Sequence, residues 1–309
     1  MSHLKLPRRW FLKASAASAM WTLCRPTLAH FQSAELKAMF DQLRVNLLQL
    51  VNEERAVAKV QALEFDDLAT RVASAHAEDM ATGEFASHWG RTGLKPYQRY
   101  SLAGGYHATQ ENVSAADNTW STKFADLKQD TSYLHVRLYQ EQPPNDGHRK
   151  TILAPQHTHV GFGIAVEKLR LRVVELFVSK YIEFEPVPPV AKPRETIEIS
   201  GRIIRSNLFL NTIEVFYEPL PVAPEKGWLR EVRSYSLPDE SQVLRPQLSP
   251  PLMYADRRDG TIEIAPDLSF RVPVQLYKTT PGIYTIVCWV RRSRGEKAFA
   301  VTGLCIRAE

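Results

Sequence analysis

The chain has 309 residues and a formal net charge of +5, and the first 29 residues contain five basic residues and no acidic one. Beyond residue 29 the chain has 34 basic and 34 acidic residues, so its charge gives no indication of nucleic-acid binding. No segment of that part is long and apolar enough to cross a membrane, which takes about 20 apolar residues. Its length suits two domains better than one.

The first 29 residues have the order of charged, apolar and small residues that is typical of an export signal. Arg8 and Arg9 are followed by three apolar residues and Lys13, which resembles the signal of the twin-arginine export route. Residues 14–23 are mildly apolar, and small residues follow up to Ala29, where a signal peptidase could cut. We therefore expect an exported protein, located in the periplasm or secreted from the cell.

Helical periodicity dominates the segment that follows. Apolar residues recur at three- and four-residue steps over residues 33–60 and again over residues 66–82, where Asp66 or Asp67 could cap the helix. A third amphipathic stretch covers residues 119–139. These patterns predict three helices in the first half of the chain.

The period changes after residue 155. Residues 159–166 and 171–181 are rich in β-branched and apolar residues and are joined by a short polar stretch, which predicts a β-hairpin. Helices followed by strands indicate an α+β layered domain, which we place at residues 33–182.

A proline-rich segment, residues 183–195, is expected to form a stiff, extended linker. Beyond it, residues 196–309 contain short strand-like runs separated by turn residues, which predicts a small all-β sandwich of immunoglobulin-like character. The expected strands are residues 196–204, 211–217, 261–264, 269–275, 282–291 and 298–305. Cys288 and Cys305 lie in these strands, and the sequence leaves open whether they form a disulfide or remain two buried thiols.

Three segments of the first domain carry polar residues in a distinctive order. They are residues 85–90, with the sequence FASHWG, residues 110–113, with QENV, and residues 145–153, with NDGHRKTIL. The sequence NEER at residues 52–55 precedes them, and Arg99 lies between the first segment and the second.

In order and spacing these segments resemble the CAP superfamily, the group of cysteine-rich secretory, antigen-five and pathogenesis-related proteins, and most of all its bacterial SCP-like members. The resemblance covers roughly residues 40–181. It implies an α-β-α sandwich with a central cleft lined by two histidines and two acids, which in some members binds a divalent metal such as zinc. Carried over to this chain, the histidines are His88 and His148 and the first acid is Glu111.

The second acid of the cleft has two candidates, Glu141 and Asp146. Asp146 is alternatively a cap on the turn that carries His148. The chain departs from the family where Gln110 replaces the usual glycine, and where prolines 143–144 end the helix before His148. These departures concern the fourth cleft position and the metal geometry, and they leave the fold unaffected.

Two imidazoles and two carboxylates can serve two kinds of chemistry. His88 and His148 could hold zinc, with Glu111 as a base or further ligand, which would give a metal-assisted hydrolase. Alternatively, the carboxylates orient the histidines by hydrogen bonds and no metal is needed. We assign no ligand role to the other histidines that we considered, which are His76, His107, His157 and His159. Ser87 lacks the G-x-S-x-G elbow of a serine nucleophile.

The second domain carries two further features. Its aromatic residues could stack on sugars or pack in the sandwich core, and they are Trp228, Tyr235, Tyr254, Tyr277 and Trp289. Four basic residues cluster at one hairpin turn, where they form a solvated tip or bind an anionic polymer: Arg291, Arg292, Arg294 and Lys297.

We expect a binding module in which the cleft, with or without a metal, and the β-sandwich together recognise a lipid, an envelope polymer or another protein outside the cytoplasm. The alternatives are the metal-assisted hydrolase and an adhesion protein in which the sandwich alone binds the partner. Truncation separates them, because a hydrolase should keep its activity in the first domain and an adhesion protein should keep its binding in the second. The oligomeric state, the ligand and the metal remain open.

Overall fold

The computed structural model describes residues 28–118 and 123–309. The expected export signal, residues 1–29, lies almost entirely outside the described residues. The chain divides into two units, residues 1–38 and 39–309. The packing and the sites described below lie within residues 39–309, which include both the α+β domain and the β-sandwich. In the part of the chain that the structure describes, no helix has both the length and the apolar character needed to cross a membrane.

A four-stranded sheet forms the centre of the first domain, with the strand order β1-β3-β4-β2. The strands are β1 (Glu64–Phe65), β2 (Ala108–Ala116), β3 (His159–Glu167) and β4 (Arg170–Ser179). The hairpin predicted near residue 170 is confirmed, since β3 and β4 pair antiparallel from His159 opposite Val178 to Glu167 opposite Arg170. β2 was not predicted as a strand, and it pairs antiparallel with β4 at one edge of the sheet.

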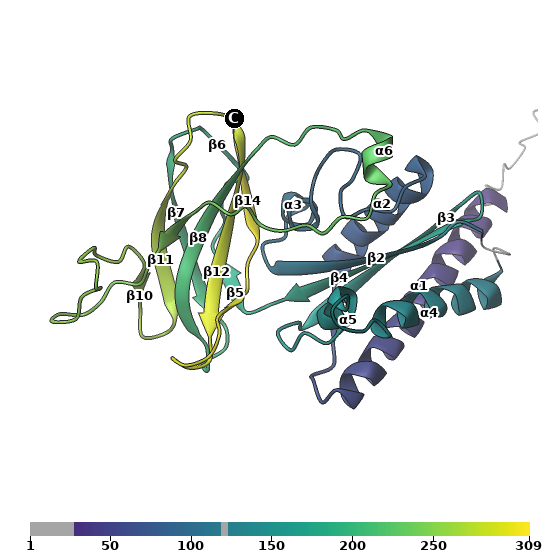
Figure 1. Ribbon diagram of the computed structural model, residues 1–309, viewed down its shortest axis with the longest axis horizontal. Helices are drawn as coiled ribbons and strands as arrows, with labels where there is room; N and C mark the ends of the chain where they lie inside the picture. The colour runs from purple at the N-terminus through teal and green to yellow at the C-terminus, as the bar shows by residue number, and fades with distance from the viewer. Residues whose placement is uncertain (1–27, 119–122) are drawn as a thin grey trace, which may run out of the picture. The chain divides into compact units, whose positions relative to one another are not determined.

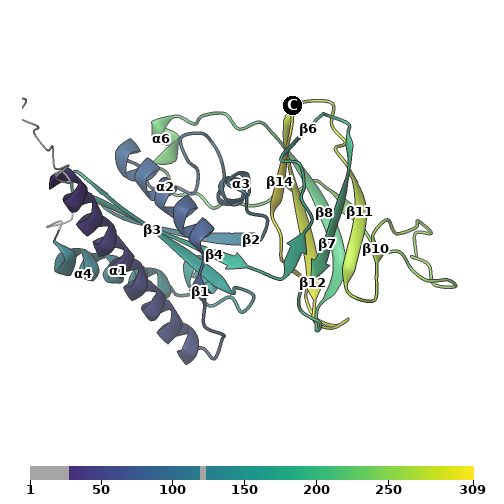
Figure 2. The ribbon, with the colours of Figure 1, turned by 180° about the vertical axis from the view of Figure 1, so that it is seen from behind.

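Helices cover both faces of this sheet (Figure 1 and Figure 2). They are α1 (Leu28–Val57), α2 (Asp67–Gly83) and α4 (Phe124–Tyr139). The predicted helix cap is confirmed at Asp66, whose carboxylate accepts a 2.5 Å hydrogen bond from the backbone N of Ala69. The prolines at 143–144 follow the end of α4, as expected from their inability to continue a helix.

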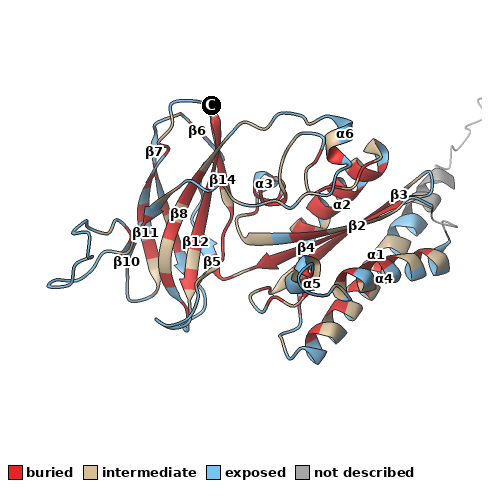
Figure 3. Cartoon of the chain, viewed as in Figure 1, coloured by how far each residue is buried: buried red, intermediate tan, exposed pale blue. Residues whose placement is uncertain are grey.

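The alternation of side chains along β4 explains why two faces are needed. Leu171, Val173 and Phe177 pack with apolar residues of α1 and α4, whereas Val174 and Leu176 pack with α2. A strand that is apolar on both faces has to be covered on both, and Figure 3 shows β4 buried along nearly all of its length.

Two glycines of β3 allow α2 to approach the sheet closely. A Cβ atom at Gly163 would lie 2.0 Å from the backbone oxygen of Ala73, and a Cβ atom at Gly161 would lie 2.2 Å from the backbone nitrogen of Thr70. Larger residues at these positions would push the helix away from the sheet, and with it the loop after α2 that carries His88.

The second domain consists of two sheets whose strands pair antiparallel, except for the short strand β6, which is parallel to its neighbour β14. One has the order β10-β11-β7-β5 and the other β6-β14-β12-β8-β9, with β13 paired to β12. The bounds are β5 Ile182–Phe184, β6 Val190–Ala191, β7 Thr196–Ile203, β8 Phe209–Pro219, β9 Ser241–Leu244, β10 Glu263–Ile264, β11 Ser269–Gln275, β12 Gly282–Arg291, β13 Phe299–Ala300 and β14 Leu304–Ala308. Their inward side chains form one apolar core. The α+β class expected for the chain is confirmed.

The proline-rich segment 183–195 contributes to these sheets. β5 pairs with β7, and β6 pairs in parallel with β14. The four prolines, at positions 186, 188, 189 and 193, lie outside these two short strands, so none of them interrupts a ladder. The segment expected as a linker thus takes part in the sandwich at two points.

Cys288 and Cys305 are free, buried thiols. The Cα partner of Cys305 on β12 is Thr285, three residues before Cys288. Burial raises the pKa of both thiols to about 12, so neither is a reactive thiolate near neutral pH.

Candidate functional site

The first histidine of the predicted cleft is held by a buried carboxylate. His88 lies in the loop after α2, and its Nδ1 atom is 3.0 Å from Oε1 of Glu111 on β2. The Glu111 side chain is 1% exposed, whereas that of His88 is 14% exposed. An ionised carboxylate can only accept hydrogen bonds, so Nδ1 of His88 is the donor and Nε2 lies on the side of the ring away from Glu111.

Arg99 fixes Glu111 from the other side. It lies on α3 (Pro96–Leu102), and its Nη2 donates to Oε2 of Glu111 at 2.6 Å. Its Nη1 donates to the backbone oxygens of His88 and Leu94, at 2.7 and 2.8 Å. Burial by itself raises the pKa of Glu111, but the nearby Arg99, His76 and His88 outweigh burial and lower the pKa to about 2. Glu111 is therefore ionised near neutral pH.

The second histidine of the cleft has its own carboxylate. Oε1 of Glu141 is 2.6 Å from Nδ1 of His148, and Oε2 accepts a 3.0 Å hydrogen bond from the backbone N of the same residue. His148 lies on α5 (Gly147–Ile152) and its side chain is 33% exposed. Both histidines thus have Nδ1 facing a glutamate and Nε2 on the opposite side of the ring.

The two candidates for the second acid are therefore distinguished by their contacts. Glu141 contacts His148, and Asp146 does not: its carboxylate pairs with Lys150 at 2.6 Å. Asp146 occupies the N-cap position of α5, but its side chain makes no capping hydrogen bond there. In this structure Glu141 is the partner of the second histidine.

Both histidine–glutamate pairs line one cavity of about 1080 Å³. Its other wall comes from the second domain, from β12, from the turn that follows it, and from the segment between β8 and β9. The sequence analysis expected the sandwich to take part in recognition, but it did not predict that the sandwich would form a wall of this cavity. Because the cavity is slightly larger than the usual range for small-molecule sites, about 300–1,000 Å³, it has room for part of a polymer.

The segment between β8 and β9, residues 220–240, packs on the first domain. The Tyr235 hydroxyl accepts a 2.9 Å hydrogen bond from the backbone N of Glu111, and its ring lies edge-on to His88 with centroids 4.8 Å apart. The Trp228 ring contacts that of Trp89, with centroids 5.1 Å apart, and Leu229, the last residue of the short helix α6 (Lys226–Leu229), belongs to the same apolar cluster. The sequence analysis placed Trp228 and Tyr235 among the aromatic residues of the sandwich. A single sequence gives no indication that the segment carrying them packs on the first domain.

Glu218 ties the end of β8 to α3. Its carboxylate accepts hydrogen bonds from the Tyr97 hydroxyl at 2.6 Å and from Gln98 Nε2 at 3.1 Å, and it pairs with Lys95. Near it, Tyr97 packs with Ile283 and Cys305 in a small apolar cluster. These contacts hold the second wall of the cavity against the first.

A buried charged network lies behind the cleft. His135 of α4 contacts Glu175 at 2.6 Å and Glu54 at 2.9 Å. Glu175 also accepts a hydrogen bond from Nδ2 of Asn112, which donates to the backbone oxygen of His148 as well. The sequence analysis did not single out His135 or Glu175. Glu175 is the one acid in the mainly apolar strand 171–178, and it was the available signal.

Hydrogen bonds to other groups position two further histidines, His76 and His157. His76 is buried, as expected for a packing residue, and its Nε2 contacts the backbone oxygen of Ser87 at 2.8 Å. His157 contacts Gln110 at 2.9 Å and Ser179 at 3.1 Å. Burial lowers the pKa of His76 to about 4 and that of His157 to about 3, so both rings are neutral. The Ser87 hydroxyl accepts from the backbone N of Trp89, and it is not paired with a base.

The cleft offers fewer free ligand atoms than a zinc ion requires. A zinc site takes three or four protein ligands, and here the two carboxylates of the cleft are engaged by Nδ1 atoms. Among the described residues no group of three or more His, Cys, Asp or Glu side chains is arranged to hold a metal ion. As arranged, His88 and His148 therefore offer two imidazole nitrogens, which is an incomplete set for zinc.

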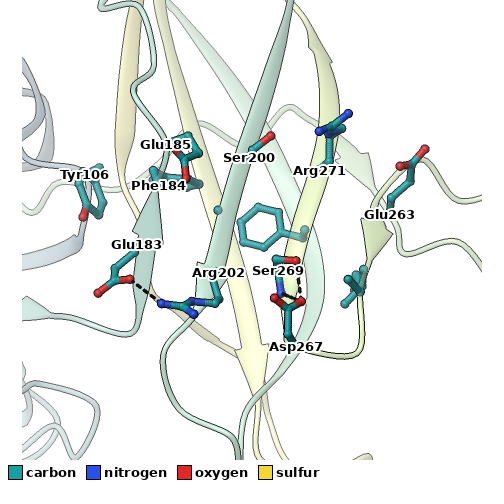
Figure 4. Close-up of a pocket in the computed structure, with 14 residues that line it drawn as sticks. Tyr106, Glu183, Phe184, Glu185, Ser200, Arg202, Glu263, Asp267, Ser269 and Arg271 are labelled. Atoms are coloured by element: carbon teal, nitrogen blue, oxygen red, sulfur yellow. Dashed lines mark hydrogen bonds and ion pairs between the residues drawn. The ribbon is translucent and has the colours of Figure 1, made fainter.

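A second hollow of about 1110 Å³ lies on the outer face of the sandwich (Figure 4). Its charged groups pair with their neighbours: Arg202 contacts Glu183 at 3.3 Å, and Asp267 accepts a hydrogen bond from Ser269 at 2.6 Å. Both members of the Arg202 pair are more than half exposed, so this is a solvated sheet face. The cavity with the two histidines is the better candidate.

Comparison with known proteins assigns the first domain. Residues 48–181 match the model of the cysteine-rich secretory protein family, CAP. No curated protein matches the chain. Similar solved structures include an extracellular protein of Bacillus anthracis that contains an SCP domain, with 22% identity and a TM-score of 0.34, over 45% of this chain and 41% of that one. An outer surface protein of Borrelia burgdorferi has 18% identity and a TM-score of 0.34, over 43% and 89%. The CAP domain of the enterococcal protein PrgA has 16% identity and a TM-score of 0.35, over 45% and 61%.

Proposed function

With residues 48–181 a CAP domain, we propose that the protein is an exported binding module that holds an envelope polymer in the cavity between this domain and the sandwich. The observation that supports it is that His88 and His148 are each fixed at Nδ1 by a glutamate and line the same cavity. Two pre-oriented Nε2 atoms can each exchange a hydrogen bond with a ligand without further ordering of the side chains, which favours binding.

Among the described residues, neither His88 nor His148 has a hydroxyl or thiol at hydrogen-bond distance, because the Nδ1 atom of each contacts a glutamate. The hydroxyl of Ser87 accepts a backbone hydrogen bond, and both described cysteines are buried thiols in the second domain. A histidine held by a carboxylate can act as a general base, but it needs a nucleophile or a water within hydrogen-bond distance in the complex. The geometry therefore favours binding over covalent catalysis.

Binding is tested by co-sedimentation of the full chain with insoluble cell-envelope polymer, using wild type, His148→Phe and His159→Phe. We expect His148→Phe to lower the bound fraction about tenfold, because the phenyl ring lacks the Nε2 atom that would bind the ligand, as well as the Nδ1 atom that contacts Glu141. His159 is a matched control, since it is partly exposed at the start of β3 and does not line the cavity. Equal retention of the two variants, or no sedimentation of wild type, would contradict the proposal.

A metal-assisted hydrolase is the second candidate. The observation that favours it is the carboxylate on each Nδ1, because metal-binding histidines are commonly oriented in this way. A zinc titration of the same chain beside the double variant His88→Ala/His148→Ala separates the candidates. Stoichiometric zinc that is lost in the double variant would favour the hydrolase, and equal zinc binding by both proteins would favour the metal-free cleft.

A further inference from the structure

The wall that the sandwich contributes to the cavity is formed by alternate residues of β12. Tyr284, Ile286 and Cys288 point into the sandwich core. Thr285, Val287 and Trp289 point the other way and line the cavity. Thr285 and Val287 are almost completely buried, whereas Trp289 is only partly covered. The face of this sheet that points away from the sandwich core is therefore covered at Thr285 and Val287, and it becomes accessible to a ligand toward Trp289.

Two unpaired cations lie at that open end. Arg292 and Lys297, on the turn between β12 and β13, both line the cavity and are exposed. Arg292 stacks on the ring of Phe299 at 5.3 Å, which restricts its side chain. Within the described residues, neither cation has a carboxylate at ion-pair distance. They are available to a ligand.

The carboxylates of the cavity are already engaged. Glu111 and Glu141 are the acidic residues of its lining, and they pair with Arg99 and His88, and with His148. The charge that a ligand meets is therefore positive, from Arg292 and Lys297. A guanidinium beside an open pocket favours a carboxylate, which it can bind through two parallel hydrogen bonds.

The rest of the lining suits a ligand that is rich in hydroxyl groups. The imidazoles of His88 and His148 and the hydroxyl of Thr285 can both donate to and accept from such groups, and the indole of Trp289 offers a flat apolar face. The indole Nε1 has no hydrogen-bond partner among the described residues, and a ligand oxygen could provide one. A lipid chain would leave these polar groups unpaired, at a cost in free energy.

We propose that the ligand is an acidic oligosaccharide segment, whose carboxylates pair with Arg292 and Lys297 and whose sugar rings lie between Trp289 and the two histidines. This proposal rests on the proposed function, because it names the class of polymer that the same cavity binds. It assigns the sandwich a direct part in recognition: the first domain binds hydroxyl groups and the second binds the charge.

Calorimetry of the full chain with a trimer of galacturonic acid and with its methyl ester tests the charge. We expect the acid to bind and the ester, which has the same sugar rings without the charges, to bind at least about tenfold more weakly. The double variant R292Q/K297Q should weaken binding of the acid by a similar factor and remove most of its dependence on salt. R257Q/R258Q, which removes two exposed arginines that do not line the cavity, is the matched control and should bind as wild type does.

Equal binding of acid and ester, or an unchanged affinity in R292Q/K297Q, would overturn the proposal. Inorganic phosphate and vesicles of phosphatidylglycerol are the competing anions. Binding of either one that is lost in R292Q/K297Q, without binding of the trimer, would also overturn it. If envelope polymer sediments wild type but not His148→Phe while the trimer fails to bind, the ligand class is wrong and the binding function stands. If polymer and trimer both fail, both proposals are wrong.

Discussion

Replacing Arg99 with methionine should lower the free energy of unfolding by about 3–5 kcal/mol, which is the usual cost of removing one partner of a buried ion pair. Arg99 and Glu111 have side chains that are 12% and 1% exposed, and their contact is 2.6 Å long. Without the guanidinium, the buried carboxylate of Glu111 keeps only the nearby imidazoles as partners. The backbone oxygens of His88 and Leu94 also lose their donor. Urea unfolding of wild type and variant measures the difference.

Two further variants identify the cause of the Arg99 effect. Arg91→Met removes an arginine that is 57% exposed and paired with Asp79, and it should cost no more than about 1 kcal/mol. Adding Glu111→Gln to Arg99→Met removes the uncompensated charge and should recover part of the loss. A cost below about 1 kcal/mol for Arg99→Met, no greater than that of an exposed pair, would show that Glu111 does not depend on this arginine.

Replacing His135 with leucine should also lower the free energy of unfolding by about 3–5 kcal/mol near neutral pH, because Glu175 would be left as a buried anion without a cation. Glu175 is completely buried, and His135 lies between it and Glu54. His159→Leu is the matched control, since that ring is partly exposed and is 3.8 Å from an exposed glutamate. Loss of the network should also loosen Asn112, which contacts both Glu175 and the backbone of His148.

The pH dependence of stability identifies this ion pair. Burial by itself would lower the pKa of His135, but Glu175 and Glu54 raise it from its usual 6.5 to about 10. A group whose pKa is raised by folding stabilises the protein fully below its unfolded value and loses that effect as the pH rises through the folded value. Wild type should therefore lose stability between about pH 6.5 and 10, and His135→Leu should lose much less over that range. Parallel profiles for the two proteins would contradict a charged His135.

The sequence predicted the secondary elements of the first domain well where the apolar period is strong. α2 with its Asp66 cap and the β3–β4 hairpin needed only local patterns. β2 was missed because an edge strand that carries Gln110, Glu111 and Asn112 has no clear alternation of apolar and polar residues. The proline-rich segment was interpreted by composition, which cannot show that its ends pair with β7 and β14.

The candidate site was only partly accessible to sequence reasoning. The resemblance to the CAP superfamily named His88, Glu111 and His148, which line one cavity in the structure. It did not decide between Glu141 and Asp146, since both lie close to His148 in the chain and only geometry separates them. The contacts of Tyr235 with His88 and Glu111 could not be predicted, because a segment 124 residues further along the chain carries no local signal of where it packs.

The most direct test of a cavity shared by the two domains is an NMR titration of the full chain with the galacturonic acid trimer. The signals to follow are the indole Nε1–H of Trp289, assigned through Trp289→Phe, and the imidazole of His148. These groups belong to opposite walls of the cavity. The account expects both signals to shift along one titration curve with the same midpoint. A shift of one signal while the other stays unchanged at saturation would show that the ligand contacts a single domain, and would contradict the shared site.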